Sequence, residues 1–354
     1  MSRFLGRQAA SLEPYVPGEQ PQDRRYVKLN TNECPYPPSP RVAQILAGHD
    51  ASVYRLYPDP EAADLRQKVA NYYGVSPSQV FVGNGSDEAL AFAFFAFFDR
   101  GDPIRFPDPS YGFYPVYADL CGLKANAIPL REDFSISPGD YFDGQGHILI
   151  ANPNAPTGLC LDRQQIEDIL KANPDKLVMV DEAYVDFAGE GITSLPLVSR
   201  YDNLLVIGTF SKSRSFAGMR LGYAISTPEI IAGIERIRYS FNPYNVNKLT
   251  QLAAIASLED DAYFKSALEK VKATRERVTG RLREMGLRVL SSGANFIFAA
   301  HPKLSGREFY LALREQGILV RCFNHPRTLE FARISIGSDE EMNALLNAVE
   351  QLKA

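Results

Sequence analysis

The stretches KLVMVDEAYVDF (residues 176–187) and NLLVIGTFSKSRSFAGMR (residues 203–220) decide the fold class. After its first residue, each stretch has an apolar run of strand length and turns polar directly after it. An apolar run without alternation is typical of a strand buried on both faces, as in a parallel sheet between two layers of helices. Two similar runs, QVFV (79–82) and HILI (147–150), are separated by long segments with helical periodicity. This order predicts an α/β fold with a mostly parallel sheet covered by helices on both faces.

The rest of the chain predicts further parts around this sheet. Residues 1–40 are rich in proline and polar groups, which favours an extended arm. Residues 41–242 contain the alternating strands and helices and are expected to form the large domain. Residues 243–354 are expected to form a smaller α+β domain, joined by the arm, because 248–286 have the apolar spacing of long helices. The strands expected there are NFIFA (295–299), GILVR (317–321) and FARISIG (331–337).

The composition favours a small molecule as the partner. A chain of 354 residues with 45% hydrophobic content is long enough for two domains. The net charge of -4, without a long run of Lys or Arg, gives no electrostatic basis for binding nucleic acid or anionic membrane. The start has no signal-peptide core and the stretch LAFAFFAFF (90–98) is too short to cross a bilayer, so a cytoplasmic protein is expected. Neither a disulfide framework nor a metal site is expected from the scattered cysteines, which are Cys34, Cys121, Cys160 and Cys322.

A ligand site is expected where polar clusters follow the four apolar strands. In doubly wound sheets, ligands bind at the carboxyl ends of the strands. Four such clusters indicate a common site more strongly than any one of them does alone. The clusters are GNGSDE (83–88), ANPNAPTG (151–158), DEAY (181–184) and SKSRSFAGMR (211–220).

The cluster GNGSDE opens a helix and is a candidate phosphate site. The free backbone N–H groups and the positive end of the helix dipole can hold a phosphate. The alternative is an ordinary helix start capped by Ser86 or Asp87. A second half of the cradle, with hydroxyl groups and a cation, is expected from Thr209, Ser211 and Arg220.

Asp181 and Lys212 each follow a buried strand. A carboxylate at position 181 is partly desolvated unless it meets a donor or a cation, and a protonated heterocycle nitrogen would satisfy it. A helix cap or a salt bridge is the alternative role for Asp181. A desolvated amine at Lys212 can act as a nucleophile, although most lysines are simply solvated.

With these residues in hand, the sequence resembles the fold type I pyridoxal-phosphate aminotransferases, and within them the histidinol-phosphate aminotransferase branch. The resemblance covers nearly the whole chain and implies a seven-stranded, mostly parallel sheet with a smaller second domain. The motifs that carry it are, in order, KLNTNECPY, RLYPDPEAADLR, GNGSDEAL, PDPSYGFY, NPNAPTG, VDEAYVDF, TFSKSRSFAGMRLGYA, ANFIF and FARISIG.

The resemblance implies a role for each residue of the cofactor site. Lys212 forms the Schiff base with pyridoxal phosphate and later moves the proton between substrate and cofactor. Asp181 pairs with the pyridinium nitrogen, and Tyr184 donates a hydrogen bond to the phenolic oxygen of the ring. The cofactor phosphate rests on the backbone amides of Ser86 and Asp87, with Thr209, Ser211 and Arg220 on its other side. Tyr111 stacks on the ring, and Tyr57 reaches the phosphate of the neighbouring subunit, which implies a homodimer with shared sites.

One position departs from the family pattern. The family usually has N-N-P-T-G, whose second Asn touches the ring oxygen, but that position is Ala155 in this chain. Either Asn154 takes over the contact, or Tyr184 alone holds the oxygen at a cost of about 1 kcal/mol for one lost hydrogen bond.

At the substrate end, the resemblance implies a pair of arginines. Arg333 matches the arginine that holds the substrate anion, since a guanidinium binds such groups bidentately. Arg321 is the second candidate, and Tyr15 of the arm is expected to help gather the substrate phosphate. The alternative for Arg321 is an exposed charge at a strand end.

The implied reaction converts histidinol phosphate and 2-oxoglutarate into imidazole acetol phosphate and glutamate, a step of histidine biosynthesis. Transamination of aromatic amino acids is the nearest alternative, because imidazole and aromatic side chains need similar apolar pockets. Decarboxylation of a phosphorylated amino acid would use the same cofactor. A non-catalytic sensor domain of a transcription regulator is a further alternative. Such proteins carry a basic helix-turn-helix extension, whereas this sequence begins almost directly with the arm, so this alternative is not favoured.

Overall fold

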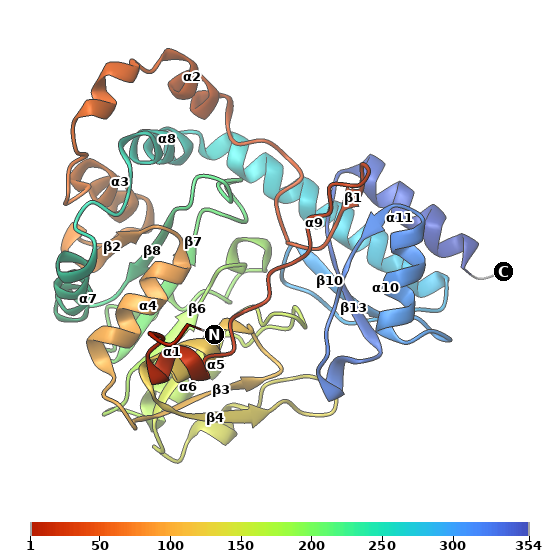
Figure 1. Cartoon of the computed structure of the whole chain (residues 1–354), viewed down its shortest axis with the longest axis horizontal. Helices are drawn as coiled ribbons and strands as arrows, with labels where there is room; N and C mark the ends of the chain where they lie inside the picture. The colour runs from red at the N-terminus through yellow and green to blue at the C-terminus, as the bar shows by residue number, and fades with distance from the viewer. Residues whose placement is uncertain (1, 353–354) are drawn as a thin grey trace.

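The computed structural model describes residues 2–352 and contains a central seven-stranded sheet with the strand order β2-β8-β7-β6-β5-β3-β4 (Figure 1). Strand β8 is antiparallel to both of its neighbours, and all other pairs are parallel. The predicted mostly parallel sheet is therefore confirmed. The strands are β2 (Val80–Gly83), β3 (Pro103–Asp108), β4 (Lys124–Pro129), β5 (His147–Ala151), β6 (Val178–Asp181), β7 (Leu204–Thr209) and β8 (Gly222–Ile225).

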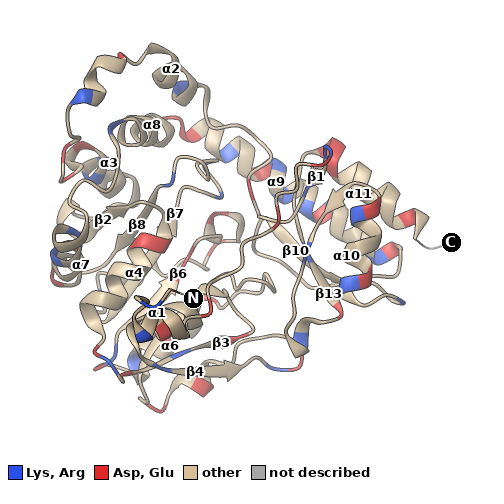
Figure 2. Cartoon of the chain, viewed as in Figure 1, with Lys and Arg blue, Asp and Glu red and all other residues tan. Residues whose placement is uncertain are grey.

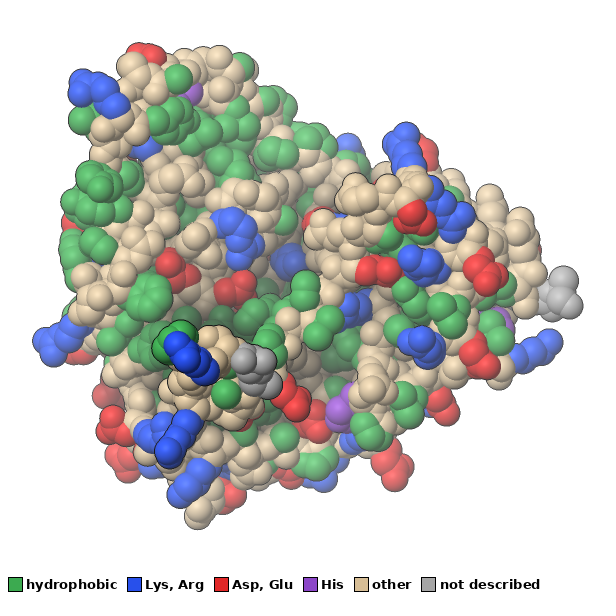
Figure 3. All heavy atoms as spheres, viewed as in Figure 1, with side chains coloured by type: hydrophobic (Ala, Val, Ile, Leu, Met, Phe, Trp, Pro, Cys, Tyr) green, Lys and Arg blue, Asp and Glu red, His purple; other side chains and the backbone are tan. Residues whose placement is uncertain are grey.

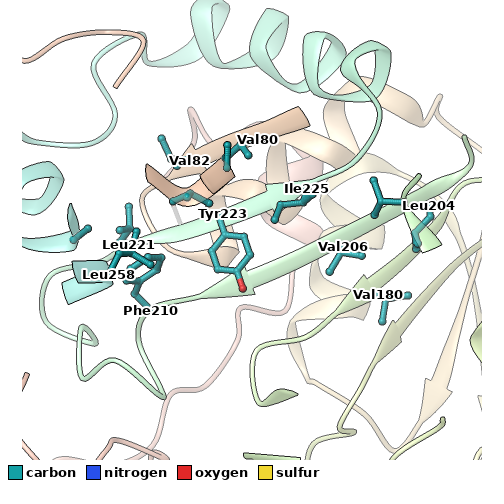
Figure 4. Close-up of a cluster of buried hydrophobic side chains, with 14 of the residues drawn as sticks. Val80, Val82, Val180, Leu204, Val206, Phe210, Leu221, Tyr223, Ile225 and Leu258 are labelled. Carbon is teal, nitrogen blue, oxygen red and sulfur yellow. The ribbon is translucent and has the colours of Figure 1, made fainter. Parts of the chain in front are cut away.

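Helices cover both faces of this sheet, because alternate residues of each strand point to opposite sides. Val178 and Val180 of β6 belong to the core on one face, whereas Met179 between them belongs to the core on the other face. Figure 4 shows side chains of β2, β6, β7 and β8 that meet on the first face. That face is covered by α2 (Pro40–Gly48), α3 (Ala63–Tyr73), α6 (Arg163–Ala172) and α8 (Lys248–Glu259), and the other by α4 (Ser86–Phe97), α5 (Phe113–Cys121) and α7 (Pro228–Phe241).

A second region contains an antiparallel sheet with the order β12-β13-β10-β9 and its own hydrophobic core. The arm reaches this region through β1 (Val27–Lys28), which pairs in parallel with β11 (Ile318–Leu319). In Figure 1 the arm runs from α1 across to the second region, where it forms β1. The elements are β9 (Arg288–Val289), β10 (Phe296–Ala300), β12 (Arg321–Cys322), β13 (Phe331–Ser335), α9 (Asp261–Glu284), α10 (Gly306–Glu315) and α11 (Asp339–Gln351).

The boundary between the two regions depends on helix α8. Residues Ala253, Ala254 and Leu258 of α8 are buried in the core of the large sheet. Helix α9 contributes Phe264 and Val271 to the core of the second region. We therefore propose a boundary between α8 and α9, rather than at residue 243.

The remaining short helices are α1 (Arg7–Ser11), η1 (Ala51–Arg55), η2 (Pro77–Gln79), η3 (Pro138–Tyr141), η4 (Val185–Phe187), η5 (Leu195–Leu197) and η6 (Pro326–Thr328).

The surface charges are interspersed in both regions. In Figure 2, acidic and basic residues are interspersed along the ribbon of both regions, without a long segment of one sign. Among residues 2–352, no helix combines the length and apolar character that crossing a membrane requires.

Candidate active site

The carboxyl ends of four strands meet at one pocket between the two regions. Strands β2 and β7 are both antiparallel to β8, so their carboxyl ends lie at the same edge as those of β5 and β6. Figure 3 shows that this face of the molecule is hollowed between the two regions. Of the fourteen residues predicted for the site, the pocket is lined by Ser86, Asp87, Tyr111, Asp181, Tyr184, Thr209, Ser211, Lys212, Arg220, Tyr15, Arg321 and Arg333.

The start of α4 forms an uncapped helix end in the pocket. Its N-cap is Gly85, at φ 89°, and in the described chain no side chain caps this helix. The alternative in which Ser86 or Asp87 caps the helix is therefore wrong. Gly222 of β8 packs directly on this turn, since a Cβ there would lie 2.2 Å from the backbone nitrogen of Ser86. The N–H groups of the first turn are thus held in place and remain suited to an anion.

Arg220 lies beside this helix end. Its backbone has the left-handed φ of 55°, which is uncommon for a residue with a side chain. Its guanidinium donates to Asp87, with Nη2 3.1 Å from Oδ2, and the Tyr111 hydroxyl donates to Oδ1 of the same carboxylate at 3.3 Å. The three side chains therefore fix one another around the edge of the anion site.

Asp181 ends β6 and is 5% exposed. Burial raises the pKa of this carboxyl to about 6, although hydrogen bonds from the Tyr114 hydroxyl, 2.9 Å from Oδ2, and from the Ala183 backbone act to lower it. A positive ring nitrogen next to Asp181 would favour the charged carboxylate again. Sequence reasoning missed Tyr114, because nothing in its local pattern shows that it turns inward toward another strand end.

Lys212 and Tyr184 lie against the N-terminal arm. The Lys212 amine donates to the Thr31 carbonyl at 3.2 Å and lies 5.8 Å from the centre of the Tyr184 ring. The Tyr184 hydroxyl accepts a hydrogen bond from Asn32 Nδ2 at 3.0 Å. Asn32 was also missed by sequence reasoning, although it lies in the motif KLNTNECPY.

Arg321 and Arg333 are cross-strand partners in β12 and β13. Directly opposite residues of two strands project on the same side of the sheet, so two like charges are held close together. Neither arginine has a carboxylate partner among the described residues: Arg321 donates to the carbonyls of Pro17 (3.0 Å) and Val16 (2.8 Å), and Arg333 to that of Asn30 (3.2 Å).

Arg333 also retains an unused donor. Its Nε is buried without a hydrogen-bond partner in the described part of the chain, and burial lowers the pKa of the guanidinium. A buried donor without a partner is costly, so an anionic ligand is expected to satisfy it. Tyr15, at the same end of the pocket, stacks on Phe113 with ring centres 4.4 Å apart.

Two predicted residues lie outside this pocket. The Asn154 amide is used within the loops, because it donates to the carbonyl of Pro109 and the hydroxyl of Thr157 and accepts from Ser110 at 2.7 Å. Its neighbour Ala155 lines the pocket instead. Tyr57 is 80% exposed and stacks on Tyr244, with ring centres 4.4 Å apart.

The fold and the pocket define a class of enzyme. A buried carboxylate, a lysine at a strand end and an uncapped helix start fit the nitrogen, aldehyde and phosphate of pyridoxal phosphate. A family model described as aminotransferase class I and II matches residues 24–349. The chain belongs to this family, and it is a fold type I, pyridoxal-phosphate-dependent aminotransferase.

Within this family, the chain groups with histidinol-phosphate aminotransferases. It is 47% identical to the one from Brachyspira hyodysenteriae and 52% identical to histidinol-phosphate aminotransferase 2 of Dechloromonas aromatica, with 99% of each chain covered in both cases. The crystal structure of the Sinorhizobium meliloti enzyme in complex with pyridoxal-5'-phosphate has the same fold, with a TM-score of 0.88, 24% identity and 99% of each chain covered. The enzyme from Clostridium acetobutylicum gives a TM-score of 0.85 at 26% identity, covering 92% of this chain and 98% of the other.

Proposed function

We propose that the enzyme transfers the amino group of histidinol phosphate to 2-oxoglutarate, which yields imidazole acetol phosphate and glutamate in histidine biosynthesis. The observation that carries this proposal is the cross-strand pair Arg321 and Arg333, which presents two guanidinium groups without carboxylate partners in the described chain. The names of the relatives support the same substrate.

The residues around the cofactor would divide the chemical work. Bound pyridoxal phosphate supplies an electron sink that stabilises the carbanion formed when the substrate Cα–H bond breaks. Lys212 would hold the cofactor aldehyde and move the proton to and from the substrate carbon. Asp181 would keep the ring nitrogen protonated, and the Tyr184 hydroxyl would donate to the phenolic oxygen.

The anion sites would hold the two phosphates at opposite ends of the pocket. Ser86 and Asp87 would offer their backbone amides to the cofactor phosphate, and Thr209, Ser211 and Arg220 would also contact it. Arg321, Arg333 and Tyr15 would gather the substrate phosphate at the arm. A phosphate carries nearly two negative charges, so it can use both guanidinium groups, whereas a carboxylate can be held by Arg333 alone.

We also propose a homodimer in which Tyr57 completes the site of the partner. Tyr57 lies outside the pocket of its own chain, follows the exposed Leu56 (59% exposed) and stacks on the partly exposed Tyr244 (41% exposed). An apolar surface of this kind is typical of a face that another protein covers. A second copy of the chain would bury it and bring Tyr57 to a neighbouring cofactor phosphate.

Steady-state assays with a panel of amino donors test the substrate. Histidinol phosphate is expected to give a higher kcat/KM than phenylalanine or tyrosine, with 2-oxoglutarate as the acceptor. If an aromatic donor is preferred, the aromatic aminotransferase alternative replaces the proposal. Carbon dioxide release without any need for an oxo acid would instead indicate a decarboxylase.

A further inference from the structure

Three successive residues of the arm contact three side chains of the site. The carbonyl of Asn30 accepts from Arg333, that of Thr31 accepts from Lys212, and the amide of Asn32 donates to the Tyr184 hydroxyl. The distances are 3.2, 3.2 and 3.0 Å, respectively. Only Asn32 acts through its side chain, so its contact is the one of the three that a substitution within the arm removes directly.

Asn32 is held rigidly in this position. It is 1% exposed and has a left-handed φ of 55°, a conformation that Asn tolerates better than most residues. Its backbone nitrogen donates to the Ser335 hydroxyl at 2.8 Å, and its carbonyl accepts from Asn295 Nδ2 at 2.9 Å. The main chain of Asn32 is thus tied to the second region on both sides of the residue.

These contacts also determine which end of the Asn32 amide faces Tyr184. Because the Ser335 oxygen already accepts from the Asn32 backbone, its own proton is free to be donated to Asn32 Oδ1, 2.9 Å away. The Nδ2 group is therefore the end that faces Tyr184. An amide nitrogen only donates, so the Tyr184 oxygen must accept from it, and the Tyr184 proton is directed elsewhere.

The Tyr184 ring is fixed on its other sides. It packs edge-on against Phe296, with ring centres 5.1 Å apart at 90°, and lies in a small apolar cluster with Ala155. With its ring held and its oxygen accepting from Asn32, Tyr184 is arranged to donate its proton into the pocket that it lines. Ala155 lies where the family pattern has the amide that touches the ring oxygen.

We propose that Asn32 is a positioning residue that acts through Tyr184 and compensates for the missing amide at position 155. By donating to the Tyr184 oxygen, Asn32 makes that hydroxyl a stronger donor toward the ring oxygen of the cofactor. This inference rests on the proposed placement of the cofactor in the pocket. A stronger bond to the ring oxygen favours its deprotonated form, so Asn32 lowers the pH at which the bound cofactor loses its proton.

The test is a pH titration of the visible absorbance band of the holoenzyme. Replacing Asn32 with Ala is expected to raise the midpoint by about 0.3 to 1 unit, the equivalent of part of one hydrogen bond. Tyr184→Phe should raise it further, because the whole donor is lost. In the Tyr184→Phe background, Asn32→Ala should add no shift, since the coupling passes through the hydroxyl that is already gone.

Two other variants separate this role from a structural one. Asn173→Ala removes an equally buried amide, which bonds to the carbonyls of Tyr141 and Ile169 in the large region, and should leave the midpoint unchanged. Ser335→Ala keeps Asn32 but frees its amide, so it should raise the midpoint by less than Asn32→Ala does. Ser335→Ala also tests the inference if the Asn32 variant does not fold.

Each outcome of the titration decides between the two proposals. If Tyr184→Phe shifts the midpoint but Asn32→Ala and Ser335→Ala do not, the inference about Asn32 is wrong and the placement of the cofactor stands. An Asn32→Ala shift that persists in the Tyr184→Phe background also overturns the inference. If Tyr184→Phe itself leaves the midpoint unchanged, the placement of the cofactor fails, and the role of Asn32 with it.

Discussion

The two halves of the pocket differ in how their charges are satisfied. In the half that we propose for the cofactor, the cofactor half, at the ends of β2, β6 and β7, Asp87 is paired with Arg220 and Asp181 accepts from Tyr114. In the half that we propose for the substrate, the substrate half, formed by the arm, β12 and β13, the hydrogen bonds of Arg321 and Arg333 within residues 2–352 go only to backbone carbonyls. A resident group needs a site that keeps its shape. A substrate that binds and leaves in each turnover needs donors that can exchange their bonds to backbone carbonyls for bonds to the substrate at low cost.

The largest expected effect is in the cofactor half, at Lys212. Lys212→Ala removes the amine that we propose both holds the cofactor and moves the proton, so activity should fall by about 10⁴-fold or more. Cofactor can still bind without a covalent bond. Borohydride reduction followed by mass spectrometry measures the covalent adduct directly, and a variant with an adduct and normal turnover would refute the role of Lys212.

Asp181→Asn should come next, with a loss of about 10²- to 10³-fold in kcat, as for one electrostatic partner of the reacting group. The neutral amide keeps the shape of the side chain but cannot stabilise a protonated ring nitrogen. Exchange of the substrate Cα proton, followed by NMR, reports this step alone. Exchange at the wild-type rate would contradict the pairing of Asp181 with the ring.

In the substrate half, Arg321→Ala should lower kcat/KM for histidinol phosphate. The loss should correspond to roughly 2 to 3 kcal/mol of transition-state stabilisation, and phenylalanine transamination should change much less. Arg333→Ala should impair both donors, because any substrate anion needs it. Arg288→Ala is a matched control, since Arg288 lies on β9 of the same sheet but outside the pocket. An equal loss with both donors in Arg321→Ala would remove the basis for a phosphate substrate.

The comparison also predicts a pH effect on stability. In the cofactor-free protein, burial raises the pKa of Asp181 from 3.8 to about 6, so the unfolded chain loses this proton at lower pH than the folded chain does. Stability contributed by the protonated carboxyl is therefore lost as the pH rises from about 4 to about 6. Asp181→Asn should be more stable than the wild type at pH 8 by on the order of 2 kcal/mol, and little different near pH 4.

Urea unfolding of both cofactor-free proteins at the two pH values measures this difference. The same substitution would then stabilise the protein and inactivate the enzyme, which would show that the cofactor half maintains a costly charge for its ligand. A difference in stability that does not depend on pH would mean that burial does not raise the pKa of Asp181 in the folded protein.

The smallest expected signal is complementation across the proposed dimer. Lys212→Ala and Tyr57→Ala proteins should each be strongly impaired alone. After subunit exchange at equal amounts, about a quarter of the sites would combine an intact Lys212 with an intact Tyr57 from the partner, and activity should return to about that level. Demonstrated heterodimers that remain inactive would argue against a shared site.

The amino-acid sequence by itself determined the large sheet and the cofactor half of the pocket. The strands around Val178–Asp181 and Leu204–Thr209 are apolar throughout because both of their faces are buried, and that pattern is local. Asp181 and Lys212 directly follow those strands, so their convergence at one edge of the sheet follows from parallel pairing alone.

Only the tertiary structure decided the rest. Asn32 meets Tyr184 across 152 positions of the chain, and Arg321 bonds to Pro17 across 304. Such contacts leave no periodic trace in the sequence, because they depend on how the arm crosses between two separately formed cores. The same kind of packing between distant segments fixed the helix start at Gly85, the contact of Tyr114 with Asp181, and the bond from the Asn154 amide to the Pro109 carbonyl.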